Sequence, residues 1–565
     1  MVDNKIDPFT VEIVKESLTS IADEMFAVIQ ATAKSPIIYE ALDFACGITD
    51  ARGRLITQGN GLTGFLGVLT FSVQAVLEAV SDEEPLETGD VFIMNDPFGA
   101  GGTHQNDVVL VEPILLEGVG LAAFAVCKAH WSDVGGAVPG SLSADAVEGY
   151  AEGLIIPCVR LRRAGIPQVS VEELILANVR DPDTALGDIN AQRACLSRAR
   201  IRFIELCARY GHDTIDLSAD ALLDHGERMV RQELKKLPHG IFHATDVMDF
   251  AGADDGIHLQ VKVTITADKF ICDFTGSDPQ VAGSLNLTWP GLVCAVRTVF
   301  KAVTGPHIDA NEGCFRPLEI ISPLGTVLSA KPRVGTSVYY EAQGHAADLV
   351  WKALAAVVPE RLSAGHFLSP CVLIVAGDGA PDGPDPFLMV EFQAGGWGAG
   401  AGKDGESAMV SVGNGESYVN SLELTETRYG IRFVRYELAP GGPGVGAGRF
   451  RGGLGVVKEF EMLCDGTLTS TIGRHTTRPW SVDGGQLGSS NLVRVTRTTG
   501  EAVELGMAGN IALRAGDRVA MITGNGAGWG DPGLRPPHDV AADVRAGYIT
   551  AEQAEADYGF TVATS

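Results

Sequence analysis

Residues 107–130 read DVVLVEPILLEGVGLAAFAVCKAH, two apolar and β-prone runs joined by the segment LEGVG. This pattern predicts a β-hairpin whose turn lies near Glu117 and Gly118. Residues that face each other across such a hairpin have numbers that sum to about 236, so Asp107 lies opposite residue 129 or 130. We therefore expect the hairpin to bring Asp107 and His130 to the same end of a sheet.

Polar side chains flank this hairpin on both sides. The segment NDPFGAGGTHQND (95–107) ends on His104 and Asp107, and the segment AHWSDVGG supplies His130 and Asp133. Two imidazoles with one or two carboxylates suit Zn²⁺, Mn²⁺ or Fe²⁺, and three protein ligands leave open positions for water or a substrate. A structural network of hydrogen bonds at the end of the sheet would use the same residue types. The residues themselves leave both readings open.

Composition limits the class of protein. The chain of 565 residues is too long for one core and predicts roughly two to four domains. The net charge of −28 comes from dispersed acidic residues, so direct binding to nucleic acid is not expected. No apolar run reaches membrane length and the N-terminus lacks the features of a signal peptide, which predicts no membrane partner and a cytoplasmic location. Ten scattered cysteines without a C-x-x-C pair are expected to be buried thiols in a reducing compartment.

Periodicity along the chain predicts an α+β, β-rich, mixed multi-domain architecture with antiparallel sheets. Helical spacing occurs in the segments 7–33, 63–80, 181–235 and 538–560. Paired strands are expected in the segments 43–59, 106–130 and 243–277 and in the glycine-rich stretch after residue 390. We therefore expect three regions: an N-terminal region with the hairpin and the metal site (1–235), a middle β-rich region (236–395), and a glycine-rich β region with C-terminal helices (396–565).

Two further groups of polar residues are candidates for the site. Glu148 and Glu152, four apart in EGYAEGL, could place two carboxylates on one helical face as a base or a further metal ligand, with Glu152 as the candidate catalytic residue; a solvated face or a loop cap is the alternative. A substrate pocket could be lined by polar residues of TGSDPQVAGSLN, although the same residue types form ordinary β-turns. These candidate substrate-binding residues are Ser277, Gln280 and Asn286.

Several long segments together resemble a known family. They include DPFTVEIVKESLTSIADEM, IYEALDFACGITDARGRLI, GDVFIMNDPFGAGGTHQNDVVLVEPI, KAHWSDVGGAVPGS, DFTGSDPQVAGSLN and GRFRGGLGVVKEF. Over nearly its full length the chain resembles hydantoinase B, the B-type subunit of the hydantoinase, oxoprolinase and acetone carboxylase family. This set of segments is far more specific than any single glycine motif.

The resemblance implies a metal site. In the family, a GTHxxD element and a following HxxD element supply ligands to a divalent metal, Mn or Zn, which corresponds here to His104, Asp107 and His130. Asp43, in ALDFACG, fits a further acidic ligand of the family. Many relatives carry a second histidine where Trp131 stands in AHWSD. Asp133 is assigned a supporting role in catalysis, orienting His130 or a turn.

The resemblance also implies a partner. Family members work with a larger A-type subunit, which binds ATP on an actin-like fold and phosphorylates an unactivated amide or an enolised ketone. This sequence contains no G-x-x-x-x-G-K-[ST] motif, so ATP is expected on the partner and not on this chain. Its glycine-dense runs GGWGAGAG, GVGAG and GNGAGWG are read as turns or close backbone packing. A hetero-oligomer is therefore expected.

Three functions fit these expectations. The first is the metal-bearing B-type component of an ATP-dependent hydrolase of cyclic amides such as hydantoins, oxoproline or lactams, in which metal-activated water attacks an amide phosphorylated by the partner. The second is a subunit of an ATP-dependent ketone carboxylase of the acetone or acetophenone type. The third is a scaffold without catalytic residues that positions the ATP-binding subunit.

Overall fold

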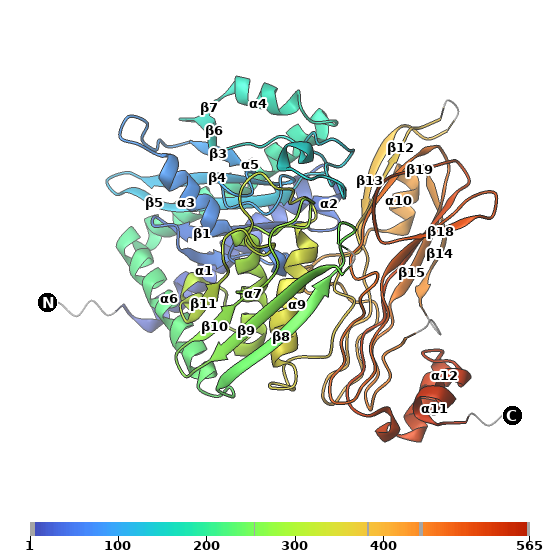
Figure 1. The fold of residues 1–565 in the computed structure, drawn as a ribbon. Coiled ribbons are helices and arrows are strands. Elements are labelled where there is room, and N and C mark those ends of the chain that lie inside the picture. The colour runs from blue at the N-terminus through green and yellow to red at the C-terminus, as the bar shows by residue number, and fades with distance from the viewer. Residues whose placement is uncertain (1–5, 254, 381–382, 440–443, 562–565) are drawn as a thin grey trace.

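The N-terminal region is built on a seven-stranded sheet with the order β2-β1-β5-β4-β3-β6-β7 (Figure 1). The computed structural model describes residues 6–253, 255–380, 383–439 and 444–561; residues 1–5 and 562–565 of the expected first and last regions lie outside them. The strands of this sheet are β1 (Phe44–Asp50), β2 (Leu55–Gln58), β3 (Val91–Met94), β4 (Asp107–Leu116), β5 (Gly120–His130), β6 (Val159–Arg163) and β7 (Ile166–Pro167).

Helices cover both faces of this sheet. One face packs against α1 (Pro8–Thr32) and α5 (Pro182–Tyr210), and the other packs against α3 (Leu69–Ala79). Neighbouring residues of β4 alternate between the two cores: Val108 belongs to the α1/α5 core and Val109 to the α3 core. Burial on both faces explains why the strands read as continuous apolar runs. The remaining elements of this region are α2 (Pro36–Tyr39), η1 (Thr63–Phe65), η2 (Gly149–Glu152), α4 (Val169–Leu176) and α6 (His212–Leu234).

The hairpin of β4 and β5 has the predicted register. Asp107 pairs with His130, and the same alignment continues to Ile114 and Ala123. A bulge after Ile114 then shifts the pairing by one residue toward the turn. Because β1 pairs with the other edge of β5, the end of β5 that carries His130 lies beside the start of β1.

The middle region combines a sheet with two buried helices. Its strands, in the order β11-β10-β9-β8, are β8 (Gly240–Met248), β9 (Ile257–Ile265), β10 (Phe270–Asp273) and β11 (Leu318–Ile321). The helices α7 (Trp289–Thr304) and α9 (Tyr339–Leu354) pack on each other, and α9 also packs on β8 and β9; a short α8 (Glu312–Phe315) adjoins α6. The sequence predicted only strands in this region. Helix α7 is buried on nearly all sides, but Arg297, Lys301 and Thr304 recur along it at helical spacing, so this periodicity was an available signal that the expectation of strands missed.

The C-terminal region contains two further sheets, seen on the right of Figure 1. One has the order β13-β12-β16-β19 and the other β14-β15-β20-β17-β18. Their strands are β12 (Leu373–Gly377), β13 (Phe387–Glu391), β14 (Ile431–Leu438), β15 (Val456–Met462), β16 (Gly466–Thr471), β17 (Leu492–Thr496), β18 (Ala502–Leu505), β19 (Met507–Leu513) and β20 (Arg518–Ile522). The other elements are α10 (Leu422–Arg428), η3 (Pro532–Leu534), α11 (Pro537–Ala546) and α12 (Ala551–Tyr558).

Two features of this region differ from local expectations. Strands β12 and β13 were placed in the middle region by sequence, but β12 pairs with β16; such a long-range pairing leaves no local pattern. Arg451 stands in the glycine-rich segment GRFRGG, where a charged residue would be expected on a surface turn, but it is buried and ion-paired with Asp543 of α11. The glycine-dense runs do pack backbone against backbone, since a Cβ at Gly526 would lie 1.9 Å from the carbonyl oxygen of Trp397. In the part of the chain that is described, no helix combines the length and apolar character needed to cross a membrane.

Candidate metal centre

Three adjacent strand ends position the predicted ligands. Asp43 immediately precedes β1, Asp107 opens β4 and His130 closes β5, and β5 lies between the other two strands. The backbone N–H of His130 donates a hydrogen bond to the carbonyl oxygen of Asp43 at 3.0 Å, and Asp107 pairs with His130 across the hairpin. The residues therefore converge because of sheet register.

His104 reaches the same place from the glycine-rich loop before β4. Gly101 has a φ of 71°, and a Cβ there would lie 2.2 Å from the Cβ of Phe71, so only glycine fits this close approach. The side chain of Asn95 bonds the carbonyl oxygen of Gln105 and the N–H of Ile156, which ties both ends of the loop to its neighbours. The glycines thus allow the loop to turn and deliver His104 beside the strand ends.

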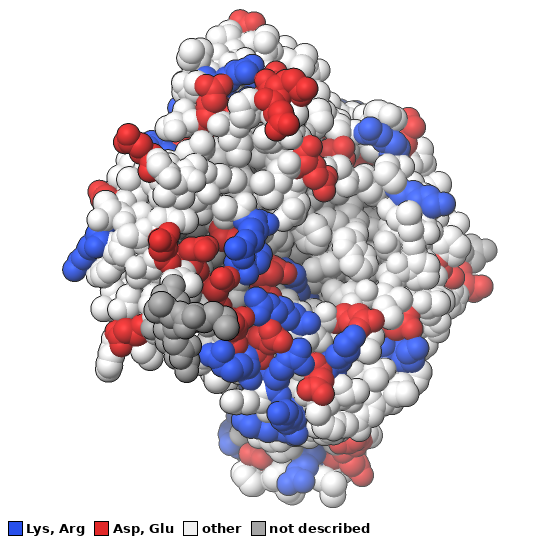
Figure 2. All heavy atoms as spheres, turned by 90° about the vertical axis from the view of Figure 1, so that its left-hand side faces the viewer, with Lys and Arg blue, Asp and Glu red and all other residues white. Residues whose placement is uncertain are grey.

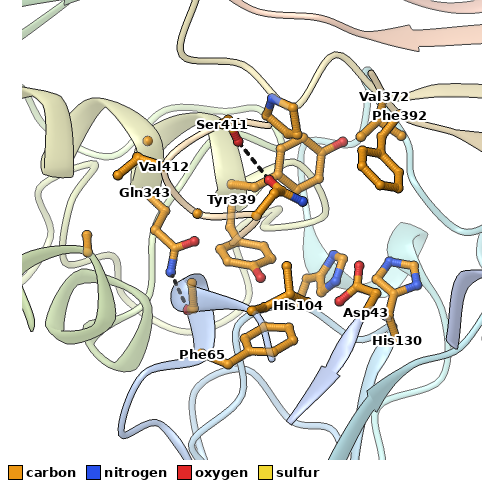
Figure 3. Close-up of a pocket in the computed structure, with 18 of the residues that line it drawn as sticks. Asp43, Phe65, His104, His130, Tyr339, Gln343, Val372, Phe392, Ser411 and Val412 are labelled. Atoms are coloured by element: carbon orange, nitrogen blue, oxygen red, sulfur yellow. Dashed lines mark hydrogen bonds between the residues drawn. The ribbon is translucent and has the colours of Figure 1, made fainter. Parts of the chain in front are cut away.

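Four buried donor atoms, that is, nitrogen or oxygen atoms that can donate a lone pair to a metal ion, meet at this point. None of them has a hydrogen-bond partner in the described structure. They are Asp43 Oδ1, His104 Nε2, Asp107 Oδ1 and His130 Nδ1. His104 Nε2 lies 3.3 Å from Asp107 Oδ1, and the two imidazole centroids are 5.0 Å apart. Figure 3 shows Asp43, His104 and His130 side by side at one pole of a cavity. Buried polar atoms normally have a partner, so four such atoms at one place need an explanation.

The donor set fits a divalent cation, although its coordination shell is not already formed. Among the described residues, no group of three or more His, Cys, Asp or Glu side chains is arranged to hold a metal ion as it stands. The unpartnered nitrogen and oxygen atoms are nevertheless of the types that Zn²⁺ and Mn²⁺ use. The argument that these residues could hold a cation therefore rests on two facts: the atoms have no hydrogen-bond partners, and they are of the types that bind such ions.

The tautomer of His104 also suits a metal ligand. His104 Nδ1 lies 3.0 Å from the carbonyl oxygen of Ser337, so Nδ1 carries the proton and Nε2 offers its lone pair to the site.

Electrostatics prepare the site for a cation. Burial raises the pKa of Asp43 well above its usual value, and the nearby Asp107 carboxylate adds to this effect. Burial would also raise the pKa of Asp107, but the Lys128 ammonium, together with the contact to His104, outweighs it and holds that pKa below its usual value. Burial lowers the pKa of His130 to about 3, assisted by His104. His130 is therefore neutral at physiological pH, as a metal ligand must be.

Three residues that sequence reasoning did not single out hold Asp107 in place. The Lys128 ammonium is 3.2 Å from Asp107 Oδ2 and donates to Thr103 Oγ1 at 2.7 Å. Thr103 in turn donates to Asp107 Oδ2, and the Tyr339 hydroxyl donates to the same oxygen at 3.4 Å. Lys128 is 1% exposed. The sequence did offer a signal for Lys128. It stands two residues before His130 in an otherwise apolar strand, so both side chains lie on the same face of the sheet.

A cavity of about 80 Å³ is lined by three of these four residues, Asp43, His104 and His130, and all three regions contribute to its wall. Helix α9 supplies Tyr339, Tyr340 and Gln343, the segment around η1 supplies Phe65, and the C-terminal region supplies Phe392. Figure 3 shows the rings of Phe65, Tyr339 and Phe392 around Asp43 and the two histidines. Three of the predicted ligands thus lie at a cavity, and the fourth, Asp107, is fully buried beside them.

The cavity adjoins a larger groove of about 1090 Å³. Both are lined by Leu62, Thr298, Ser411 and Val412. The groove runs along α1 and α6 and carries charges of both signs, including Lys15, Arg228 and Asp309. Figure 2 shows the face that bears the N-terminus, where acidic and basic side chains intermix beside a hollow. The groove and the cavity are therefore neighbours that share part of their lining.

Asp133 and Glu152, predicted as catalytic, are buried but are not among the residues that line the cavity. Asp133 accepts hydrogen bonds from the N–H groups of Gly135 and Gly140 and pairs with Arg180 at 2.7 Å, so it organises the loop after β5. Glu152 accepts hydrogen bonds from the N–H groups of Thr336 and Ser337, three contacts of 2.8 Å. Burial nevertheless raises the pKa of Glu152 to about 7. Both carboxylates hold backbone segments next to the site.

The remaining candidates lie elsewhere. Glu148 precedes the 3₁₀ turn η2 and is exposed, whereas Glu152 is buried, so the two carboxylates do not share an environment. The polar residues of 275–286 make turn contacts: Ser277 with Gln260, Gln280 with the N–H of Lys331, and Asn286 with Val281, Gly283 and Gly335. The Trp131 indole donates to Gln192 of α5 and is buried in the core of the N-terminal region. It points away from the donor cluster, toward the opposite face of the sheet.

Comparisons with known proteins agree over the whole chain. The model of the family described as hydantoinase B/oxoprolinase matches residues 7–532. The chain is 31% identical to the B component of the putative D-/L-hydantoinase of Pseudomonas sp. (strain NS671), covering 99% of this chain and 96% of that protein. It is 30% identical to the beta component of the caprolactamase of Pseudomonas jessenii, covering 99% and 97%.

Solved structures show the same fold. The crystal structure of the ATP-dependent caprolactamase from Pseudomonas jessenii superposes with a TM-score of 0.92 at 28% identity, covering 99% of this chain and 97% of that one. A nucleotide-free acetone carboxylase superposes with a TM-score of 0.90 at 19% identity, covering 99% and 80%, a likeness of fold alone. The family match and the relatives identify the chain as a member of the hydantoinase B/oxoprolinase family.

Proposed function

We propose that the chain is the metal-bearing B-type component of an ATP-dependent hydrolase of cyclic amides. The observation that carries this proposal is the group of four buried, unpartnered donor atoms, three of which belong to residues that line a cavity. The names of the hydantoinase and caprolactamase relatives support the reaction class. Both relatives are named as one subunit of a larger enzyme, which supports a partner. We propose that this partner is an A-type, actin-like protein that binds ATP.

We propose that Asp43, His104, Asp107 and His130 hold one divalent cation, either Zn²⁺ or Mn²⁺, with Fe²⁺ as a further possibility. Such a cation supplies Lewis acidity and lowers the pKa of water at neutral pH. Asp43 and Asp107 supply two negative charges against its two positive charges, and the Lys128 ammonium adds one further positive charge beside them. The Lys128 ammonium keeps Asp107 ionised before the cation binds, and the Ser337 carbonyl fixes the tautomer of His104.

The chain's other residues then position a substrate. The rings of Phe65, Tyr339 and Phe392 enclose the cavity and exclude bulk water from the polar pole. Glu152 holds the backbone at Ser337, and through it the imidazole of His104. The amide is expected to be activated by phosphorylation on the partner, because resonance makes an unactivated amide a poor electrophile.

The proposal is tested with the chain produced together with an A-type ATP-binding partner. Metal content is measured by mass spectrometry, and ATP-dependent phosphate release is followed with hydantoin, a lactam, or a ketone plus bicarbonate. We expect about one divalent ion per chain, turnover of a cyclic amide, and loss of both in His104→Ala and His130→Ala. His258→Ala, at an exposed histidine, is the control and keeps both.

Two outcomes separate the alternatives. Turnover of the ketone with bicarbonate, and of no cyclic amide, would replace the hydrolase with a carboxylase. Equally low metal content in wild type and in His104→Ala, with the partner still bound, would favour the scaffold that only positions the ATP-binding partner.

A further inference from the structure

Helix α9 carries one amide side chain that uses only half of its hydrogen-bonding groups. Gln343 lines the cavity and is 6% exposed. Its nitrogen Nε2 donates to the carbonyl oxygen of Gly64 at 2.9 Å and to that of Gly291 at 3.3 Å. Both protons of the amide are therefore committed. The oxygen Oε1 accepts no hydrogen bond from the part of the chain that the structure describes.

These two contacts fix the direction in which the amide points. The oxygen and nitrogen of a glutamine are told apart by their hydrogen-bond partners. A reversed amide would set Oε1 of Gln343 against two carbonyl oxygens, which have no proton to donate. Figure 3 shows Oε1 turned toward Tyr339 and the interior of the cavity, away from the bond to Gly64.

Two glycines keep the space beside this oxygen open. A Cβ at Gly64 would lie 3.1 Å from Oε1 of Gln343, and a Cβ at Gly413 would lie 3.8 Å from it. Both glycines line the cavity, although Gly64 belongs to η1 and Gly413 to the C-terminal region. Side chains at these positions would narrow the approach to the oxygen. The acceptor is therefore accessible from the cavity.

Gln343 lies on the same part of the cavity wall as one of the proposed metal ligands. Tyr339 stands four residues before Gln343 on α9, so the two side chains are neighbours on the helix surface. The ring of Tyr339 contacts that of His104, with 4.8 Å between the centroids. Figure 3 shows Tyr339 between Gln343 and the two histidines. A molecule that reaches the histidines along Tyr339 can therefore also contact Oε1.

An almost buried acceptor without a donor needs one from a bound molecule. Two other polar groups of the wall are already paired: the Tyr340 hydroxyl is hydrogen-bonded to Thr471 at 2.6 Å, and the Ser411 hydroxyl donates to Asn414 at 2.7 Å. A cyclic amide carries an N–H directly beside its carbonyl carbon, whereas a simple ketone has no N–H. The unpaired oxygen of Gln343 therefore complements the amide.

We propose that Gln343 determines specificity: its Oε1 accepts a hydrogen bond from the ring N–H of a cyclic amide, so the site selects rings with a hydrogen on the nitrogen of the bond to be cleaved. This inference rests on the proposed function of the chain. Phosphorylation of the amide oxygen withdraws electrons from that nitrogen and makes its N–H a stronger donor, so the contact is strongest with the activated substrate. Methylation of the nitrogen leaves Oε1 unpaired, which a site built around this acceptor disfavours.

The test uses two isomeric rings of the same size. Hydantoin methylated at N1 keeps the N–H between its two carbonyl groups, and hydantoin methylated at N3 loses it. With the two-subunit complex and ATP, kcat/KM for 1-methylhydantoin should exceed that for 3-methylhydantoin by about tenfold or more. 2-Pyrrolidinone and N-methyl-2-pyrrolidinone form the corresponding pair of lactams. Equal values within a pair, or a higher value for the ring without the N–H, would overturn the inference.

A variant then assigns the preference to the oxygen. Gln343→Met keeps the side-chain length and removes the acceptor, so it should lower kcat/KM for the ring with the N–H by about tenfold or more and leave the other ring nearly unchanged. Tyr340→Phe is the matched control, because Tyr340 also lines the cavity but its hydroxyl is bonded to Thr471; it should leave the ratio of the two rings at its wild-type value. An equal loss for both rings in Gln343→Met would mean that Gln343 only supports the backbone or binds water, and would overturn the inference. If Gln343→Met does not fold, the wild-type comparison decides.

Saturation-transfer NMR on the chain alone separates this inference from the proposed function. 1-Methylhydantoin should receive more saturation than 3-methylhydantoin in the wild type, and this difference should vanish in Gln343→Met. That binding pattern without turnover of any of the four rings would keep the role of Gln343 and sink the hydrolase. Turnover of both members of a pair at equal kcat/KM would sink the role of Gln343 and keep the hydrolase. Neither binding nor turnover of any of these rings would sink both.

Discussion

The substitution Lys128→Met tests whether the site is electrostatically prepared for a cation. Lys128 and Asp107 are 1% and 0% exposed, and their charged atoms are 3.2 Å apart. Removing one member of a buried ion pair leaves the other charge uncompensated, which costs about 3–5 kcal/mol. Methionine keeps most of the side-chain volume, so little of this loss comes from a cavity.

The chain contains a matched control. Lys458 and Glu391 form a second buried pair, 1% and 2% exposed, at 2.6 Å. Lys458 also lies over an aromatic ring, that of Phe433, as Lys128 lies over Phe65. Lys458→Met should therefore be destabilised by a similar amount while the metal site stays intact.

The assay is thermal unfolding in the presence of a chelator and again with saturating Zn²⁺ or Mn²⁺. In chelator both variants should unfold roughly 6–20 °C below wild type, since 1 kcal/mol shifts Tm by about 2–4 °C in a unit of 150–250 residues. At one metal concentration, a hundredfold excess over the wild-type Kd adds about 2.7 kcal/mol to the wild type, and a variant that binds the ion more tightly gains more. The metal-induced rise should be largest in Lys128→Met, because there the ion is the only charge that compensates Asp107. The same rise in all three proteins would refute this reasoning.

Three other substitutions probe the surroundings of the site. Glu152→Gln places an amide NH₂ against the N–H donors of residues 336 and 337, so His104 should shift and metal affinity should fall about 10–100-fold in a chelator competition; unchanged affinity would count against a positioning role. Asp133→Asn should lower the free energy of unfolding by about 1–3 kcal/mol without loss of metal, because its partners are loop N–H groups and Arg180; metal loss would contradict this. Burial raises the pKa of Glu341 from 4.5 to about 8, so the folded chain keeps a proton that the unfolded chain releases, and stability should fall as pH rises between these values. Glu341→Gln should remove the part of this fall in stability that comes from Glu341. If the difference in Tm between the variant and the wild type stays constant between pH 5 and 8, the raised pKa of Glu341 is refuted.

The position of the site could be predicted because it depends on local pairing. One turn signal at LEGVG set the register of β4 and β5, and that register brought Asp107 opposite His130. His104 followed because it is three residues from Asp107 in a loop of glycines. Asp43 came from family resemblance, since its approach requires β1 to pair with the far edge of β5, a long-range contact that no local pattern encodes.

The residues that surround the cavity could not be predicted in this way. Tyr339 and Gln343 lie on α9, more than two hundred residues from His104, and Phe392 belongs to a different sheet again. Asp133 and Glu152 were reasonable acids by type and position, but the structure uses their oxygen atoms to bind backbone N–H groups. Sequence shows which residues carry charge, whereas the tertiary fold decides which charges face a cavity.

The most direct measurement is anomalous X-ray scattering from crystals of the chain grown with Mn²⁺ or Zn²⁺, recorded on both sides of the metal's absorption edge. The account predicts one strong peak among Asp43, His104, Asp107 and His130, at about 2.0–2.2 Å from the ligand atoms if the ion is zinc. Peaks only elsewhere, or ordered water bonded to these four donor atoms with no ion, would contradict it.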